Sequence, residues 1–179
     1  MMLIFFIIFV YLYIYIYKKE RYLSSDDDLW EDKRNIEYNN CYAYAFTDID
    51  SNRLMKPQPG FKKNLELLNR SNYSCSALIE RVLGDFPDST YIDNNPESNY
   101  IRCSDGYHLV FLAIDSENRD YHFYRRNSNG LWTHKPGSTE VIHIDASNNI
   151  ITNPFLSNRS FKDYQYKIPC GFFCVKTER

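Results

Sequence analysis

The apolar pattern of the chain changes midway from helical to strand spacing. Residues 74–83 carry apolar side chains at helical spacing, whereas residues 108–114 (HLVFLAI) form a nearly continuous apolar run, which suits a buried central strand. Residues 120–126 (DYHFYRR) alternate between two faces, which is the period of a strand, and the turn-like segment 115–119 precedes them. Helices followed by an antiparallel meander predict an α+β domain with helices packed on an antiparallel sheet.

Shorter apolar segments complete the predicted sheet at residues 131–134, 141–144, 150–151 and 171–175. The chain has 179 residues, a length that fits one domain with a short appendage. We therefore expect residues 25–179 to form a single domain.

The first residues form an apolar segment of another kind. Residues 1–17 contain no charged side chain and neither Pro nor Gly, and Lys18 and Lys19 end the run. A helix of that length spans roughly 25 Å, close to the ~30 Å hydrocarbon core of a bilayer. A signal peptide would carry basic residues before the run and small residues at a cleavage site. The sequence therefore predicts a transmembrane anchor and stalk at residues 1–24, with membrane lipid as the partner of residues 1–17.

Two features place the domain on the cytosolic side of that membrane. Lys18, Lys19 and Arg21 follow the anchor, and basic flanks favour the cytosolic face. The five cysteines are an odd number without paired spacing, which predicts free thiols, no disulfide and a reducing compartment.

The remaining composition limits the partners of the domain. A net charge of −2 leaves no electrostatic footprint for nucleic acid. The four histidines lie in separate segments, so we expect no metal site, and no cofactor is predicted.

Cys41 is the strongest candidate for a chemically active side chain. Asn40 is a good helix N-cap, which puts Cys41 in the first turn of a helix, where unsatisfied backbone N–H groups favour a thiolate. A nucleophilic cysteine also needs a base, and His122 lies on the alternating strand, one hairpin from His134. His108 is an alternative base. A structural role stays open, because a cysteine is often simply a small buried side chain.

Residues 40–45 (NCYAYA) resemble the helix-opening Cys-aromatic-Ala-aromatic run of papain-like cysteine proteases. The order of a cysteine on the first helix, a histidine on a strand and a polar residue on the next strand is also similar to the NlpC-type cell-wall peptidases. Residues 120–125, 132–137 and 171–175 resemble a set of uncharacterised bacterial and large-DNA-virus proteins.

The resemblance implies a papain-like domain with a Cys-His-His set: Cys41 as nucleophile, His122 as base and His134 as the group that orients the base. It also suggests an oxyanion donor. Asn35 stands six residues before the cysteine, where papain-like enzymes place a glutamine, and Asn39 or Asn40 could substitute for it.

Two functions remain open on this reading. The first is a membrane-anchored thiol hydrolase, of the cysteine protease or amidase type, with a peptide or acyl substrate. The second is a membrane-anchored structural protein, such as a minor protein of a virion membrane that binds capsid proteins, in which the papain-like fold is idle. The distance between Cys41 and a histidine, and the burial of the thiol, discriminate between them.

Overall fold

The computed structural model describes residues 7–11, 13, 28–69, 71–93 and 100–177. Its elements form a small α+β domain. In chain order they are η1 (Asp28–Trp30), α2 (Lys33–Tyr38), α3 (Cys41–Ala45), η2 (Phe61–Lys63), α4 (Cys75–Asp85), β1 (Thr90–Ile92), β2 (Tyr107–Asp115), β3 (Asp120–Arg126), β4 (Trp132–Thr133) and β5 (Ile168–Lys176).

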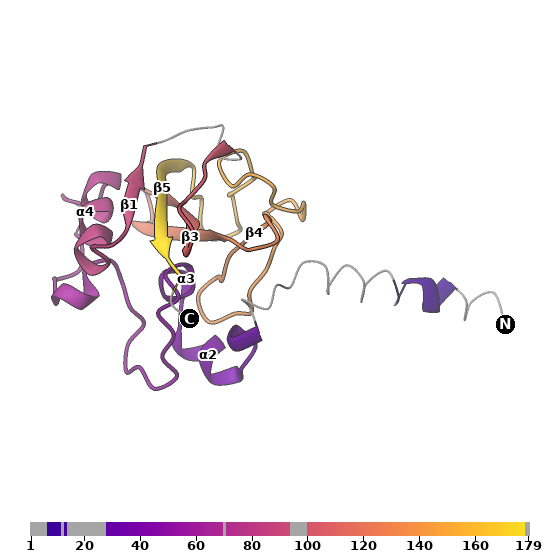
Figure 1. The fold of residues 1–179 in the computed structure, drawn as a ribbon. Helices are drawn as coiled ribbons and strands as arrows, with labels where there is room; N and C mark the ends of the chain where they lie inside the picture. The colour runs from indigo at the N-terminus through magenta and orange to yellow at the C-terminus, as the bar shows by residue number, and fades with distance from the viewer. Residues whose placement is uncertain (1–6, 12, 14–27, 70, 94–99, 178–179) are drawn as a thin grey trace.

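The strands form a five-stranded antiparallel sheet in the order β1-β5-β2-β3-β4. Figure 1 shows α4 beside β1 on one side of the sheet and β4 on the other. In the centre, Val110 pairs with Phe173 of β5 and with Arg125 of β3. β2 and β3 coincide with the two strands predicted at residues 108–114 and 120–126.

Side chains alternate between the two faces of the sheet and build a core on each. On one face, Tyr42 of α3 and Val82 of α4 pack with Phe123 and Phe173. The opposite face holds a second cluster of Leu109, Phe111, Ala113, Tyr124, Trp132, Ile151, Tyr166, Phe172 and Cys174. The first face is therefore covered by helices, and the second by the long connections that precede β5.

Two disulfides link segments that contribute to these cores covalently to β5. Cys75 at the start of α4 is bonded to Cys170, and Cys103 is bonded to Cys174, with Cα–Cα distances of 5.2 and 5.5 Å. The prediction of five free thiols is therefore wrong. The partners lie 95 and 71 residues apart, so their spacing along the chain carries no pairing signal. Cys41 remains a free, buried cysteine.

The predicted membrane anchor is also wrong for the part of the chain that the structure describes. No helix there is long and apolar enough to cross a membrane, which overturns both the transmembrane helix in the predicted fold class and the single-pass localisation. Residues 7–11 and 13 are helical, while the rest of the predicted anchor and stalk lies outside the described residues. An uncharged apolar run indicates a preference for apolar surroundings. Its composition alone does not show that it forms a membrane-spanning helix.

The predicted cytosolic orientation depended on the membrane anchor, so it is no longer supported. It also depended on free thiols, whereas four of the five cysteines are paired. Paired cysteines are typical of an oxidising compartment rather than a reducing one.

Candidate functional site

A cavity of about 670 Å³ brings the predicted cysteine and two of the predicted histidines to one place. Its lining includes Asn40 and Cys41 at the start of α3, Tyr121 and His122 on β3, and His134 just after β4. These residues come from segments far apart in the sequence. The order of elements predicted from the sequence therefore does bring Cys41, His122 and His134 to one cavity.

The two histidines form a hydrogen-bonded pair whose tautomers follow from the surrounding atoms. His122 Nε2 lies 2.6 Å from His134 Nδ1, and His134 Nε2 lies 3.1 Å from the Ile144 carbonyl oxygen. A carbonyl only accepts, so His134 Nε2 carries the proton and its Nδ1 accepts from His122 Nε2–H. In the neutral pair, the remaining nitrogen of His122, Nδ1, then has a free lone pair and can act as a base.

The burial of the pair supports this neutral state. His122 is 4% exposed and His134 is fully buried. Burial, followed by the proximity of His134, lowers the pKa of His122 well below its ordinary value. Burial lowers the pKa of His134 to about 4, against a smaller opposite effect of the hydrogen bond to Ile144. Both rings are therefore neutral at pH 7.

The pair reaches across the hairpin on a diagonal. Arg125 pairs with Thr133 and Arg126 with Trp132. Continued by one residue, that register sets His134 opposite Tyr124, with ring centroids 4.8 Å apart. Diagonal neighbours on one face are close enough for long side chains to meet. The two histidines therefore meet without being directly opposed.

Cys41 occupies the helix start that the sequence predicts. The side chain of Asn40 accepts a 3.1 Å hydrogen bond from the Ala43 N–H, which is the contact of an N-cap. Cys41 is 6% exposed, and its Sγ lies 3.9 Å from the Tyr121 carbonyl oxygen. Burial raises the pKa of the thiol to about 12, although the Phe123 N–H lowers it. The expected thiolate is therefore wrong for the resting state, because burial outweighs the helix start.

The helix and the histidine pair approach β3 from different sides. α3 packs on one face through Tyr42, whose ring lies 5.3 Å from that of Phe123. His122 projects from the other face, where its ring stacks on Tyr166 at 5.0 Å. Cys41 lines the cavity beside Tyr121, near the start of β3. α3 therefore does not pack on the same face of β3 as His122.

The other predicted site residues are engaged elsewhere. The Asn35 side chain donates a 2.7 Å hydrogen bond to the Leu29 carbonyl, and Asn35 is not among the described residues that line the cavity. Asn40 lines the cavity, but its amide donates to the Pro57 carbonyl at 2.8 Å. His108, the alternative base, has Nε2 2.7 Å from the Ala45 carbonyl, at the far end of α3 from Cys41. The structure does not bring Asn35 or His108 to the cavity.

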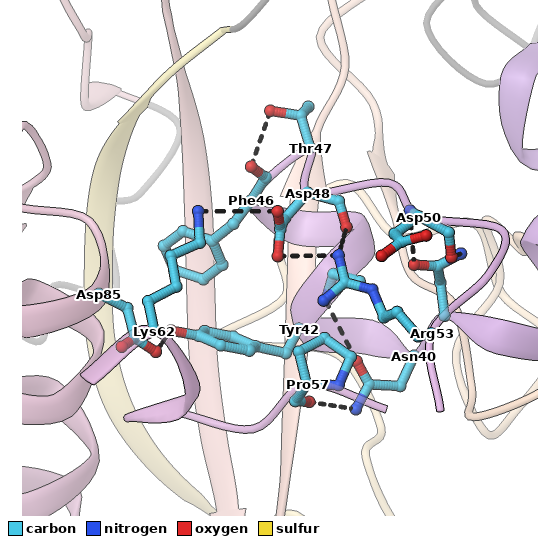
Figure 2. A network of polar contacts seen from close by, with 12 residues as sticks. Asn40, Tyr42, Phe46, Thr47, Asp48, Asp50, Arg53, Pro57, Lys62 and Asp85 are labelled. Carbon is cyan, nitrogen blue, oxygen red and sulfur yellow. Dashed lines mark hydrogen bonds and ion pairs between the residues drawn. The ribbon is translucent and has the colours of Figure 1, made fainter. Parts of the chain in front are cut away.

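Polar contacts join α3 to the loop that follows it and to α4 (Figure 2). Arg53 forms an ion pair with Asp48 at 3.0 Å, and Lys62 approaches the same carboxylate at 3.6 Å. Deeper in the network, the Asp85 carboxylate accepts hydrogen bonds from the Tyr42 hydroxyl at 2.8 Å and from the Gly60 N–H at 2.7 Å. This network fixes the helix that carries Cys41 on the side away from the histidines.

Sequence reasoning missed Lys135. Its ammonium group donates 2.7 Å hydrogen bonds to the carbonyls of Ile36, Asn39 and Gly137, and the side chain is fully buried. Burial, followed by Lys56, lowers the pKa of Lys135 to about 8, so it remains charged at neutral pH. In the sequence, Lys135 is simply a lysine next to His134. Its role becomes apparent only in the fold, which places three carbonyls around its ammonium group.

The described part of the chain shows no evident set of side chains that could bind a metal ion. No group of three or more His, Cys, Asp or Glu side chains among those residues is arranged to hold a metal ion. The cavity instead presents a thiol, an imidazole pair and several tyrosines.

Comparison with known proteins gives the family of the chain. Over 123 residues it is 30% identical to insoluble matrix shell protein 1 of Ruditapes philippinarum, and the alignment covers 68% of this chain and 71% of that relative. The chain belongs to the family of insoluble matrix shell protein 1. No protein-family model matches it, and no solved structure matches it either.

Proposed function

We propose that this protein is a thiol hydrolase of the cysteine protease or amidase type. Cys41 is its nucleophile, His122 its base and His134 the group that orients the base. One observation carries the proposal. The hydrogen bond between His122 and His134 leaves a lone pair on His122 Nδ1, and His122 lines the same cavity as Cys41.

The directions in which the pKa values of Cys41 and His122 are shifted determine how the first step of the reaction proceeds. The resting pair is a neutral thiol and a neutral imidazole, since burial raises the pKa of Cys41 and lowers that of His122. The thiol proton therefore moves to His122 Nδ1 as Sγ attacks the substrate carbonyl, which is general-base catalysis. His122 then gives that proton to the leaving group. Water hydrolyses the thioester with the same base.

The cavity supports a peptide or acyl substrate. Its lining combines aromatic side chains, among them Tyr121, Tyr164 and Tyr166, with the polar start of α3. Aromatic walls with a few converging polar groups are typical of sites for organic ligands. The two disulfides fit an oxidising compartment as the place of action.

Labelling the native protein without reductant tests the proposal. Iodoacetamide at pH 9 is expected to modify Cys41 alone, because the other four cysteines are paired. Hydrolysis of acyl and peptide substrates is then expected to disappear in Cys41→Ala and His122→Ala. His108→Gln, remote from the cavity, is the matched control. A native protein whose Cys41 resists the reagent until it is denatured contradicts the hydrolase.

The family relationship favours a second candidate, a structural component of an insoluble matrix. The name of the relative describes such a role for that protein. In this case Cys41→Ala leaves the partition of the protein into an insoluble fraction unchanged, and no substrate is hydrolysed. The disulfides are consistent with both functions, so the decisive readout is the reactivity of Cys41.

A further inference from the structure

A buried hydroxyl in the cavity has no partner. The Tyr73 hydroxyl is inaccessible to solvent and forms no hydrogen bond with any described residue. Tyr73 lies directly before Ser74, the N-cap of α4, and it lines the same cavity as Cys41. Buried polar groups are nearly always paired, so an orphaned hydroxyl at a cavity indicates a missing partner.

The hydroxyl is suited to donate rather than to ionise. Burial, followed by the negative charges of Asp120 and of an ionised Cys41, raises the pKa of Tyr73. The proton therefore stays on the oxygen at neutral pH.

Attack by a thiol creates an oxyanion that needs donors. The first turn of a helix leaves backbone N–H groups without a partner in the helix, and Cys41 is the first residue of α3. The side-chain amides expected from the sequence are engaged with other groups: Asn35 donates to the Leu29 carbonyl and Asn40 to the Pro57 carbonyl. A second donor is missing from the site as the sequence predicts it.

We propose that the Tyr73 hydroxyl is this second oxyanion donor, an assignment that rests on the proposed hydrolase function. As Cys41 Sγ bonds to the carbonyl carbon, the π electron pair moves to the oxygen, and Tyr73 donates a hydrogen bond to it. The pair returns when the bond to the leaving group breaks. Tyr73 keeps its proton throughout and takes no part in the proton transfer through His122.

Two reagents with different chemistry separate this role from a structural one. N-acetyl-phenylalaninal adds to a thiol and forms a tetrahedral hemithioacetal, whose oxygen occupies the place of the oxyanion while His122 holds the thiol proton, whereas iodoacetamide alkylates sulfur by displacement of iodide and forms no such oxygen. In Tyr73→Phe we expect the affinity for the aldehyde, measured as protection of Cys41, to fall about 100-fold, the usual effect of losing one such donor. The rate of alkylation is expected to stay within about twofold of that of the unmodified chain, because no oxyanion forms there.

The thermal midpoint provides an independent check on folding. Removing a hydroxyl that has no partner leaves no other group unpaired, so Tyr73→Phe is expected to melt at the same temperature or higher. Tyr100→Phe is the matched control, because Tyr100 is 78% exposed and is not among the residues that line the cavity. It is expected to bind the aldehyde as the unmodified chain does.

Each other outcome overturns the assignment in a distinguishable way. If Tyr73→Phe changes neither reaction, Tyr73 is not a donor while the hydrolase stands. If it slows both reactions equally, Tyr73 positions the thiol instead. If Cys41 of the unmodified chain reacts with neither reagent, the hydrolase itself fails, and the assignment fails with it.

Discussion

Lys135 donates a 2.7 Å hydrogen bond from Nζ to the carbonyl of Asn39, the second residue before Cys41. Lys135 directly follows His134, so one buried ammonium group joins the two halves of the cavity. Its further bonds to the Ile36 and Gly137 carbonyls satisfy the end of α2 and the turn after β4. Without it, the three carbonyls would lose the ammonium donor that they share.

We expect Lys135→Met to destabilise the protein by about 3 kcal/mol or more, since an unpaired buried polar group costs about 1–3 kcal/mol. The rate at which iodoacetamide modifies Cys41 should change as well, because the entry to α3 loses its anchor. Urea unfolding and the labelling rate measure the two effects. Lys33→Met, on the exposed side of α2, is the control. Equal stability of both variants would show that the three carbonyls find other partners.

The reactivity of Cys41 should follow its raised pKa. Only the thiolate reacts with iodoacetamide, and burial raises the pKa of this thiol to about 12. The labelling rate of the native protein is therefore expected to rise about tenfold per pH unit between pH 7 and 10. The denatured chain, whose thiol has an ordinary pKa of about 8.5, should level off above pH 9. A rate that is already flat below pH 7 would instead indicate a thiolate–imidazolium pair.

Thiol counting tests the disulfides directly. Under denaturing conditions without reductant, one thiol should titrate, that of Cys41, and five after reduction. Because the cross-links join residues 95 and 71 positions apart, chain entropy predicts that each stabilises the fold by about 4 kcal/mol. Reduction should therefore lower the melting temperature sharply. Five thiols before reduction would restore the expectation drawn from the sequence.

Gly171 marks a close approach within the sheet. Its φ is +115°, and a Cβ there would lie 2.8 Å from the Ile92 carbonyl oxygen. Gly171→Ala is expected to lower the free energy of unfolding by about 2 kcal/mol or more, because strain and steric overlap add. Gly106→Ala, at φ +80° with open space around it, should show the smaller effect of conformation alone. Equal losses in the two variants, measured by urea unfolding, would exclude the overlap with β1.

The sequence predicted those features that depend on neighbours along the chain. The alternation of residues 120–126 located β3, and the capping preference of Asn40 located the start of α3. The hairpin between His122 and His134 is short, so the sequence identified its two strands as neighbours, but the register sets Tyr124 rather than His122 opposite His134. Local periodicity and turn chemistry were sufficient for these elements.

Features set by packing could not be predicted in the same way. The pKa of Cys41 depends on how deeply α3 is buried, and burial reverses the effect of the helix start. Nothing in the sequence indicates partners for the side-chain amides of Asn35 and Asn40. In the fold, these amides donate hydrogen bonds to the carbonyls of Leu29 and Pro57. Periodicity carries no information about which distant carbonyl lies next to a side chain.

Acid should destabilise the protein through its neutral histidines. The unfolded chain binds a proton at His134 below pH 6.5, whereas the folded chain does so only near pH 4. Since the unfolded state binds more protons in this window, the free energy of unfolding falls as the pH falls from 6.5 to 4. The shift corresponds to about 3 kcal/mol from His134, and His122 adds to it.

Urea unfolding between pH 7 and 4.5 measures this loss, above the range in which carboxylates such as Asp115, whose pKa is lowered, begin to protonate. In His134→Gln the side-chain oxygen can still accept from His122, but one buried titrating group is gone. The variant should therefore lose less stability over the same range than the unmodified chain. Parallel curves would mean that His134 has the same pKa in the folded and the unfolded chain. His134 of the folded protein would then be protonated below pH 6.5 and would donate from Nδ1 to His122 Nε2, so the lone pair assigned to His122 Nδ1 would not be available there.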